Sequence, residues 1–288
     1  MTYSTLRRLL PTDAPQVDAR RRTLLLAGAS LLLTGCAETG LVTTDTARER
    51  KWATEIVPKL TVGEAVYLET PRTVRTIGRE KFLALYTEAR RPVGAVILCH
   101  GSGMNPDAGI IGLLRTDLAA RGYTTLSIQM PILGTDLSGR AGTTDDDKRN
   151  YPLLFEDGGE RIGAAAKFLQ AKGSPRVAIV AYGMGARMSE FYLAHFAEAP
   201  IVAWVAISIS NGEFAATGRV RVPTLDVYAD NDVADVVKGA SYRGAVLRAI
   251  PRSRQVKIAN TDHGYTGKEV PLAIEIQRFL DGLRQASS

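Results

Sequence analysis

Four segments of the sequence carry side chains that could do acid–base or nucleophilic chemistry, and each follows an apolar run. They are HGSG (His100–Gly103), YGMGA (Tyr182–Ala186), ADNDVAD with Asp230, Asp232 and Asp235, and NTDHGYTG with His263. A histidine beside a carboxylate can act as a general base, and it needs a hydroxyl, a thiol or a water to deprotonate. The sequence offers such a base, whereas Gly183, at the centre of the second segment, offers no side chain at all.

The elements that must position these segments alternate along the chain from Gly63 onward. Residues 93–100 form a near-continuous apolar run, which indicates a strand covered on both faces. Residues 107–122 then have the pattern of a helix, with Asp107 as its N-cap and Gly122 as its stop. Continued alternation of this kind predicts an α/β domain with a mostly parallel sheet and helices on both faces. Ligands bind such sheets beyond the carboxyl ends of the strands, where all four segments fall.

Together the four segments resemble the α/β-hydrolase superfamily, over roughly residues 63–285. His100 and Gly101 resemble its oxyanion loop, Asp232 its acid and His263 its catalytic histidine, in the chain order which that fold uses. The resemblance implies a three-layer α/β-hydrolase fold for residues 63–288. It also implies that Met184, after the elbow, lines the oxyanion region with His100 and Gly101.

The chain departs from the superfamily at the nucleophile elbow. The elbow pattern G-x-S-x-G, placed on Ala181–Gly185, puts Gly183 where the serine belongs. An elbow residue with a Cβ is strained by about 1–3 kcal/mol, whereas glycine enters that conformation freely. The loss of the serine is therefore compatible with the fold, and we expect Gly183 to have a positive φ and to lie close to His263. In this respect the chain most resembles an uncharacterised bacterial branch of exported proteins in which the elbow serine can be missing.

Two functions remain open from the sequence. The first is a non-catalytic or atypical protein that binds a small-molecule, lipid or envelope ligand at the degenerate elbow. The alternative is an active, esterase-like hydrolase in which His263 and Asp232 activate either a water or Ser102, the nearest serine. Asp230 competes with Asp232 for the acid position. His100 is expected to shape the oxyanion loop rather than to act as a base.

Other classes of site are disfavoured. The GMG turn is a poor dinucleotide fingerprint because Met188 stands where close helix–strand packing needs a small residue. No CxxC or HExxH spacing occurs, and three histidines are few, so we expect neither a metal nor a cofactor. The formal net charge is +6, but residues 1–35 carry +3 of it on five arginines and two aspartates. The remainder is only mildly basic, which disfavours nucleic-acid binding.

The N-terminus predicts export and a membrane anchor. Three arginines at 20–22 precede an apolar run of 12 residues at 23–34, which is too short to span a bilayer and fits a signal peptide. The run ends in LTGC, which resembles a lipobox with Cys36 as the lipidated residue, and the paired arginines also resemble a twin-arginine signal. We therefore expect a signal peptide at 1–35, a lipid-anchored tether at 36–62, and a protein of the cell envelope, anchored in the outer membrane and facing the periplasm.

Overall fold

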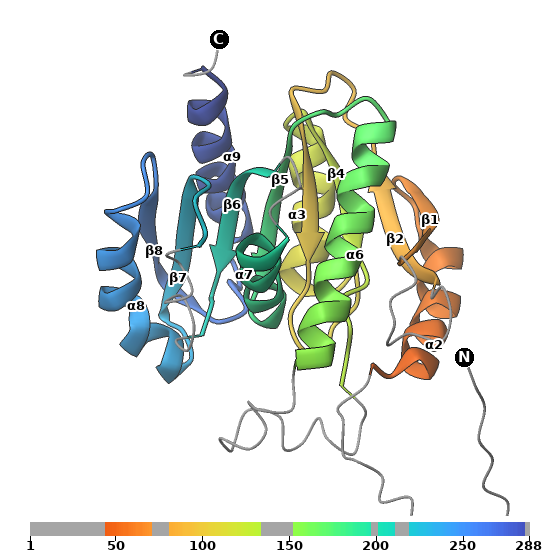
Figure 1. Cartoon of the computed structure of the whole chain (residues 1–288), viewed down its shortest axis with the longest axis horizontal. Helices are drawn as coiled ribbons and strands as arrows, with labels where there is room; N and C mark the ends of the chain where they lie inside the picture. The colour runs from red at the N-terminus through yellow and green to blue at the C-terminus, as the bar shows by residue number, and fades with distance from the viewer. Residues whose placement is uncertain (1–43, 71–80, 134–151, 197–200, 211–218, 286–288) are drawn as a thin grey trace, which may run out of the picture. The chain divides into compact units, whose positions relative to one another are not determined.

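The computed structural model describes residues 44–70, 81–133, 152–196, 201–210 and 219–285, all within the compact unit Val42–Ser288 (Figure 1). The strands are β1 (Glu64–Glu69), β2 (Lys81–Thr87), β3 (Gly94–Cys99), β4 (Tyr123–Ile128), β5 (Val177–Tyr182), β6 (Ile201–Ile207), β7 (Thr224–Asn231) and β8 (Arg254–Asp262). The helices are α2 (Thr46–Ile56), the short 3-10 helix η1 (Val57–Lys59), α3 (Gly109–Ala120), α6 (Pro152–Ala171), α7 (Met184–His195), α8 (Ala234–Leu247) and α9 (Glu269–Gln285).

The strands form one sheet in the order β1-β2-β4-β3-β5-β6-β7-β8. Pairing is antiparallel from β1 to β2 and from β2 to β4, and parallel across the rest of the sheet. The central strands β3, β4 and β5 are buried almost throughout, as strands covered on both faces must be. This is the mostly parallel sheet that the sequence predicts.

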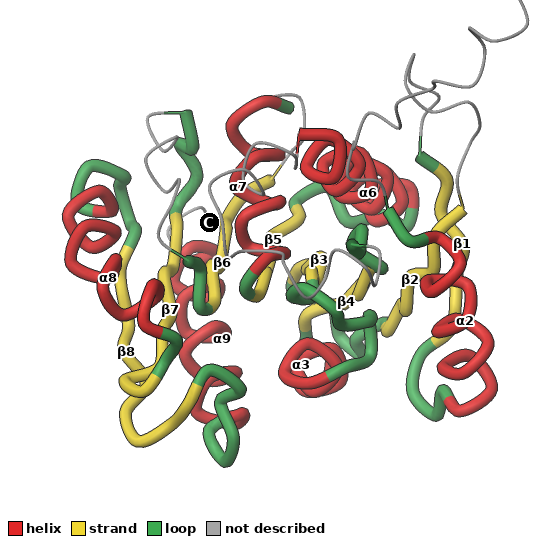
Figure 2. Tube along the Cα trace, turned by 90° about the horizontal axis from the view of Figure 1, so that it is seen from below, coloured by secondary structure: helices red, strands yellow, loops and turns green. Residues whose placement is uncertain are grey.

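Helices cover both faces of the sheet, which gives three layers (Figure 2). One apolar core joins the sheet to α6 and α7, through residues such as Ile162 and Met188. The other joins the opposite face to α3 and α9, through residues such as Leu114 and Ile276. Adjacent strand residues serve opposite cores, as Val96 and Ile97 do in β3, because side chains alternate across a strand. The three-layer α/β fold predicted from the sequence is therefore confirmed.

The corner between β5 and α7 is closely packed. Helix α7 begins at Met184, directly after Gly183, and its first turn passes over the end of β3. A Cβ on Gly185 would lie 2.4 Å from the carbonyl oxygen of His100 and 2.7 Å from that of Cys99. Gly185 therefore allows the start of α7 to approach the oxyanion loop that follows β3.

The described part of the predicted tether is not an extended linker. Residues 46–59 form α2 and η1, and Glu49 of α2 is buried against α6. There Arg161 donates to Glu49 at 3.0 Å and also pairs with Asp157 at 3.1 Å. A buried carboxylate needs such a partner, so α2 is held to the sheet domain by a desolvated ion pair as well as by Ala53. The folded domain thus begins before residue 63.

The predicted signal peptide at 1–35 and the lipidation site Cys36 lie outside the described residues. Within the described part of the chain, none of the helices combines the length and the apolar character needed to cross a membrane.

Replacing Gly185 with alanine should destabilise the fold. Because the new methyl group would overlap two backbone oxygens, we expect Gly185→Ala to lower the free energy of unfolding by about 1–3 kcal/mol or more. The matched control is Gly282→Ala in α9, where a Cβ meets no atom within 4 Å and should add about 0.5–1 kcal/mol of helix stability. Urea unfolding measures both; equal midpoints would contradict the close approach at Gly185.

Candidate functional site

The acid and histidine segments meet at the carboxyl edge of the sheet. Asp232 follows β7 and His263 follows β8, its neighbour in the sheet, so both side chains leave adjacent parallel strands at the same edge. His263 Nδ1 donates to Asp232 Oδ1 at 2.5 Å. The Asp232 side chain is fully buried, whereas that of His263 is 38% exposed. The arrangement orients the imidazole and leaves its second nitrogen, Nε2, facing away from the carboxylate.

The other contacts of Asp232 keep it charged. Oδ2 accepts from Ser208 Oγ at 2.5 Å and from the backbone N–H of Ala229 at 3.1 Å, and Oδ1 also accepts from the N–H of Val233. Burial raises the pKa of Asp232, but hydrogen bonds from His263, Ser208 and Ala229 outweigh it and hold the pKa below its ordinary value. Asp232 is therefore an ionised acceptor suited to stabilise a protonated His263.

Asp230 has a different contact set. Its carboxylate accepts the backbone N–H groups of Asn260 and Thr261, at 2.8 and 3.1 Å. These bonds lower its pKa and join β7 to the last residues of β8. Of the two aspartates that the sequence left open, Asp232 contacts His263 and Asp230 does not.

The elbow has the geometry expected for a missing serine. Gly183 follows β5 and precedes α7, with φ 54° and ψ −117°, which confirms the positive φ predicted for it. A Cβ built there meets only the Cα of Gly101, at 3.8 Å, so the position has room for a side chain. The residue before it, Tyr182, donates from its hydroxyl to the carbonyl oxygen of His263 at 3.1 Å, and the two rings lie 5.1 Å apart. The elbow and the histidine loop are thus in direct contact.

Backbone donors lie beside the empty position. No side chain caps the start of α7, so the N–H of Met184 has no acceptor within the helix. Gly101 approaches the elbow so closely that a Cβ on it would lie 2.9 Å from the Tyr182 ring. This places Gly101 and Met184 on either side of Gly183, where the resemblance expects an oxyanion-binding pair.

His100 is a structural residue of the oxyanion loop. Its Nε2 accepts the backbone N–H of Met130 at 2.9 Å, so its Nδ1 carries the proton and donates to the carbonyl of Gly101 at 2.9 Å. Burial lowers the pKa of His100 to about 4, and the nearby charge of Arg161 acts in the same direction. His100 is therefore neutral and fully engaged, as expected for a residue that shapes the loop.

No described nucleophile is paired with His263. Ser102 lies in the turn after β3, is exposed, and makes no side-chain hydrogen bond in the described structure. Cys99 is buried in β3, and burial raises the pKa of its thiol far above neutrality. An activated serine or cysteine must lie within hydrogen-bond reach of its base, so neither residue is activated in this structure.

Two residues of the site escaped the sequence analysis. Ser208, just after β6, has φ 50° and its hydroxyl lies between Asp232 and the hydroxyl of Tyr265, 2.9 Å from the latter. Tyr265 is fully buried two residues after His263. Neither a serine at a strand end nor a tyrosine in a loop stands at a sequence spacing that would indicate a role in the site. Only the fold brings them to the acid.

The described residues contain no cluster of three or more histidine, cysteine, aspartate or glutamate side chains that could hold a metal ion.

The chain matches a known protein family. The family described as "Protein of unknown function (DUF3530)" matches residues 67–261. The chain belongs to this family. The matched range includes Gly183 and Asp232 and ends two residues before His263. None of the curated proteins matches the chain.

Solved structures with the same fold are α/β hydrolases. A dienelactone hydrolase from Anabaena variabilis is 18% identical, with a TM-score of 0.57 over 76% of this chain and 97% of its own. An esterase from Pyrococcus furiosus is 14% identical, with a TM-score of 0.57 over 76% and 91%. A serine hydrolase without a lid from Xanthomonas campestris is 18% identical, with a TM-score of 0.55 over 77% and 95%. Because these sequence identities are low, the structural similarity shows a shared α/β-hydrolase fold and nothing about activity.

The burial of His100 predicts a pH dependence of stability. The unfolded imidazole binds a proton below about pH 6.5, whereas the folded one does so only below about 4. The unfolded state thus binds more protons between these values, and this contribution to stability is lost as the pH falls through that window. His100→Gln, which does not titrate, should show a flatter fall between about pH 6.5 and 4 in urea unfolding.

The control for this measurement is His195→Gln, because His195 is exposed on α7. That variant should keep the pH dependence of the wild type. An unchanged pH dependence in His100→Gln would show that His100 titrates normally in the folded protein.

Proposed function

We propose that this chain is an atypical α/β-hydrolase-fold protein that binds a small ligand at a degenerate elbow and forms no acyl-enzyme. The observation that carries the proposal is Gly183, which occupies the elbow with a positive φ and no side chain. A serine hydrolase depends on a hydroxyl at that point for its covalent intermediate. Without that hydroxyl, the site can still bind a ligand, but it has no nucleophile with which to form a covalent intermediate.

The ligand chemistry follows from what remains at the elbow. The N–H of Met184 and the adjacent Gly101 loop suit a carbonyl or carboxylate oxygen. Because Nδ1 of His263 holds its proton toward Asp232, the exposed Nε2 can donate to the same group only when the ring is protonated. Small carboxylates, fatty acids and esters of the envelope have this chemistry. A ligand of this kind would occupy the space in which an acyl group sits in active relatives of the fold.

The place of action that we propose is the cell envelope, with Cys36 as a lipid anchor to the outer membrane on its periplasmic side. The support is the order of basic residues, a short apolar run and LTGC at residues 20–36. Cys36→Ser should move the chain from the membrane fraction to the soluble fraction of the envelope; an unchanged membrane fraction would contradict the anchor.

Gly183→Ser tests the function directly. Because the position has room for a side chain and His263 is held by Asp232, the new hydroxyl should find a base already in place. We expect a burst of p-nitrophenol from p-nitrophenyl acetate in stopped-flow measurements, whereas the wild type should show none. The serine should also cost about 1–3 kcal/mol of stability through backbone strain at φ 54°.

The double variant Gly183→Ser/His263→Ala is the control. General-base catalysis contributes about 10²–10⁴-fold, so the acylation rate should fall by at least about a hundredfold. An equally fast burst in the double variant would mean that the new serine is not activated by His263.

A slow, burst-free hydrolysis by the wild type fits the proposal, because sites stripped of a triad member retain about 10³–10⁴-fold catalysis over water. The alternative, hydrolysis by a His263-activated water or by Ser102, makes a different prediction. It requires the wild-type rate to collapse in His263→Ala or in Ser102→Ala. Such a collapse would contradict a binding function.

A further inference from the structure

A cavity lies at the amino end of β8, the opposite end of that strand from His263. Arg254 begins β8 and is eight residues from the strand's last residue, Asp262, next to His263. Arg254 and Asp262 pair with Leu225 and Asn231 of β7, which are six residues apart, so at about 3.3 Å per residue Arg254 lies some 20 Å from the acid–histidine pair. The cavity has a volume of 420 Å³ between the start of β8 and α9, within the usual range for small-molecule sites.

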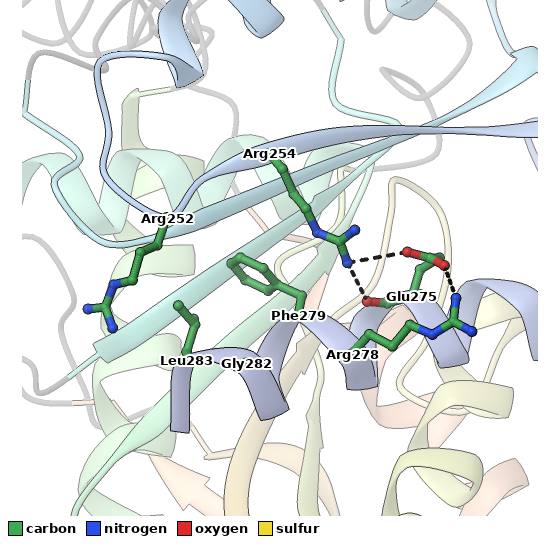
Figure 3. A pocket seen from close by; sticks show the side chains of 7 residues that line it. All are labelled: Arg252, Arg254, Glu275, Arg278, Phe279, Gly282 and Leu283. Atoms are coloured by element: carbon green, nitrogen blue, oxygen red, sulfur yellow. Dashed lines mark hydrogen bonds and ion pairs between the residues drawn. The ribbon is translucent and has the colours of Figure 1, made fainter. Parts of the chain in front are cut away.

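Three arginines surround this cavity (Figure 3). They are Arg252 in the turn before β8, Arg254 on β8 and Arg278 on α9. One carboxylate, Glu275, lies among them and uses both of its oxygens: Oε1 accepts a hydrogen bond from Arg278 at 2.7 Å, and Oε2 forms an ion pair with Arg254 at 3.2 Å. The four groups together carry a net charge of +2.

Arg252 is the arginine without a described partner. It is exposed and has φ 62°, a conformation that is unfavourable for a residue with a Cβ. The turn around it is fixed, because Ser253 Oγ accepts the backbone N–H of Thr224 and the Ser253 N–H bonds to Ile250. Figure 3 shows Arg252 and Arg254 on either side of Phe279. The fold thus holds an unpaired guanidinium at the rim of the cavity.

The floor of the cavity is apolar. Phe279 and Leu283 are buried residues of the core under α9, and both line the cavity. Between them Gly282 presents no side chain, and a Cβ there would meet open space. An apolar group of modest size can therefore lie on the floor while an anion meets the arginines.

We propose that this cavity binds a phosphate monoester that bears an apolar substituent. A phosphate dianion balances the net charge of +2, whereas a carboxylate leaves half of it uncompensated. Guanidinium groups bind phosphate oxygens in a bidentate manner, and the apolar floor accommodates the substituent. The cavity lies outside the elbow, and its α9 residues lie beyond the range matched to the DUF3530 family.

Phenyl phosphate is the probe, titrated into the purified full chain by calorimetry at low salt. We expect saturable binding that is tighter than that of benzoate, which shares the ring, and of inorganic phosphate, which lacks it. Affinity for phenyl phosphate should rise between about pH 5 and 7 as the second phosphate proton is lost near pH 6, whereas affinity for benzoate should not. Because benzoate belongs to the ligand class proposed for the elbow, the comparison uses only the binding that Arg252→Gln removes. Phenyl phosphate binding in that component no tighter than that of benzoate would overturn the proposal.

Arginine variants locate the site. Arg252→Gln and Arg278→Gln should each weaken phenyl phosphate binding by at least about tenfold, because each removes a charged hydrogen-bond donor. Arg248→Gln is the matched control, since it removes the same charge from an exposed position at the end of α8, outside the cavity. An equal loss in Arg248→Gln, or no loss in Arg252→Gln, would overturn the proposal.

A binding experiment with lipid vesicles distinguishes a soluble phosphate ligand from a lipid headgroup. Phosphatidylcholine vesicles with and without phosphatidic acid are compared for the wild type and Arg252→Gln. Enrichment on phosphatidic acid that Arg252→Gln abolishes would assign the site to a lipid phosphate. If phenyl phosphate binds while the two kinds of vesicle behave alike, the site is assigned to a soluble phosphate. Failure to bind either ligand overturns this site and leaves the elbow proposal untouched.

Discussion

The left-handed turn at Gly183 is the constraint on which the arrangement of the site depends. It reverses the chain from β5 into α7 within one residue, and this brings the start of α7 over the end of β3. Gly185 permits that approach by leaving the His100 and Cys99 carbonyls unobstructed. The oxyanion loop, the free N–H of Met184 and the contact between Tyr182 and His263 all follow from this one corner. A turn built for a nucleophile thus remains intact without one.

The acid–histidine pair is similarly complete. Asp232 receives four hydrogen bonds, from His263, Ser208, Ala229 and Val233, and the last three would hold the carboxylate whether or not His263 did chemistry. These three contacts hold the carboxylate in place whatever residue stands at position 183. Ionised Asp232 also suits binding, because it fixes the ring of His263 and keeps Nε2 turned away from itself.

The sequence predicted the fold well because its signals were local. The apolar run at 93–100 and the glycine corner at Gly183 each specify one element, and their order specifies the superfamily. The start of helix α8 at Ala234 is less readable, because the aspartates of ADNDVAD resemble a loop. A short helix within residues 47–60 was readable from the sequence, but its packing on the sheet domain was not, because the ion pair between Glu49 and Arg161 joins residues 112 positions apart.

The residues of the candidate site likewise differ in whether the sequence alone could predict them. Asp232, His263 and Gly183 could be named from strand ends, whereas the choice of Asp232 over Asp230 needed the hydrogen bonds of each carboxylate. Ser208 and Tyr265 could not be named, because their roles arise only where β6, β7 and the His263 loop converge. The arginine cavity could not be predicted either, since Arg252 and Arg278 lie on different elements and line one cavity only because α9 packs on the sheet.

We propose that no serine of the wild-type chain is an activated nucleophile. Treatment of the purified protein with a fluorophosphonate probe, followed by intact-mass spectrometry, measures this directly. We expect an unmodified wild-type mass under conditions in which an active serine hydrolase is fully labelled. A stoichiometric adduct on the wild type, at Ser102 or at any other serine, would contradict it.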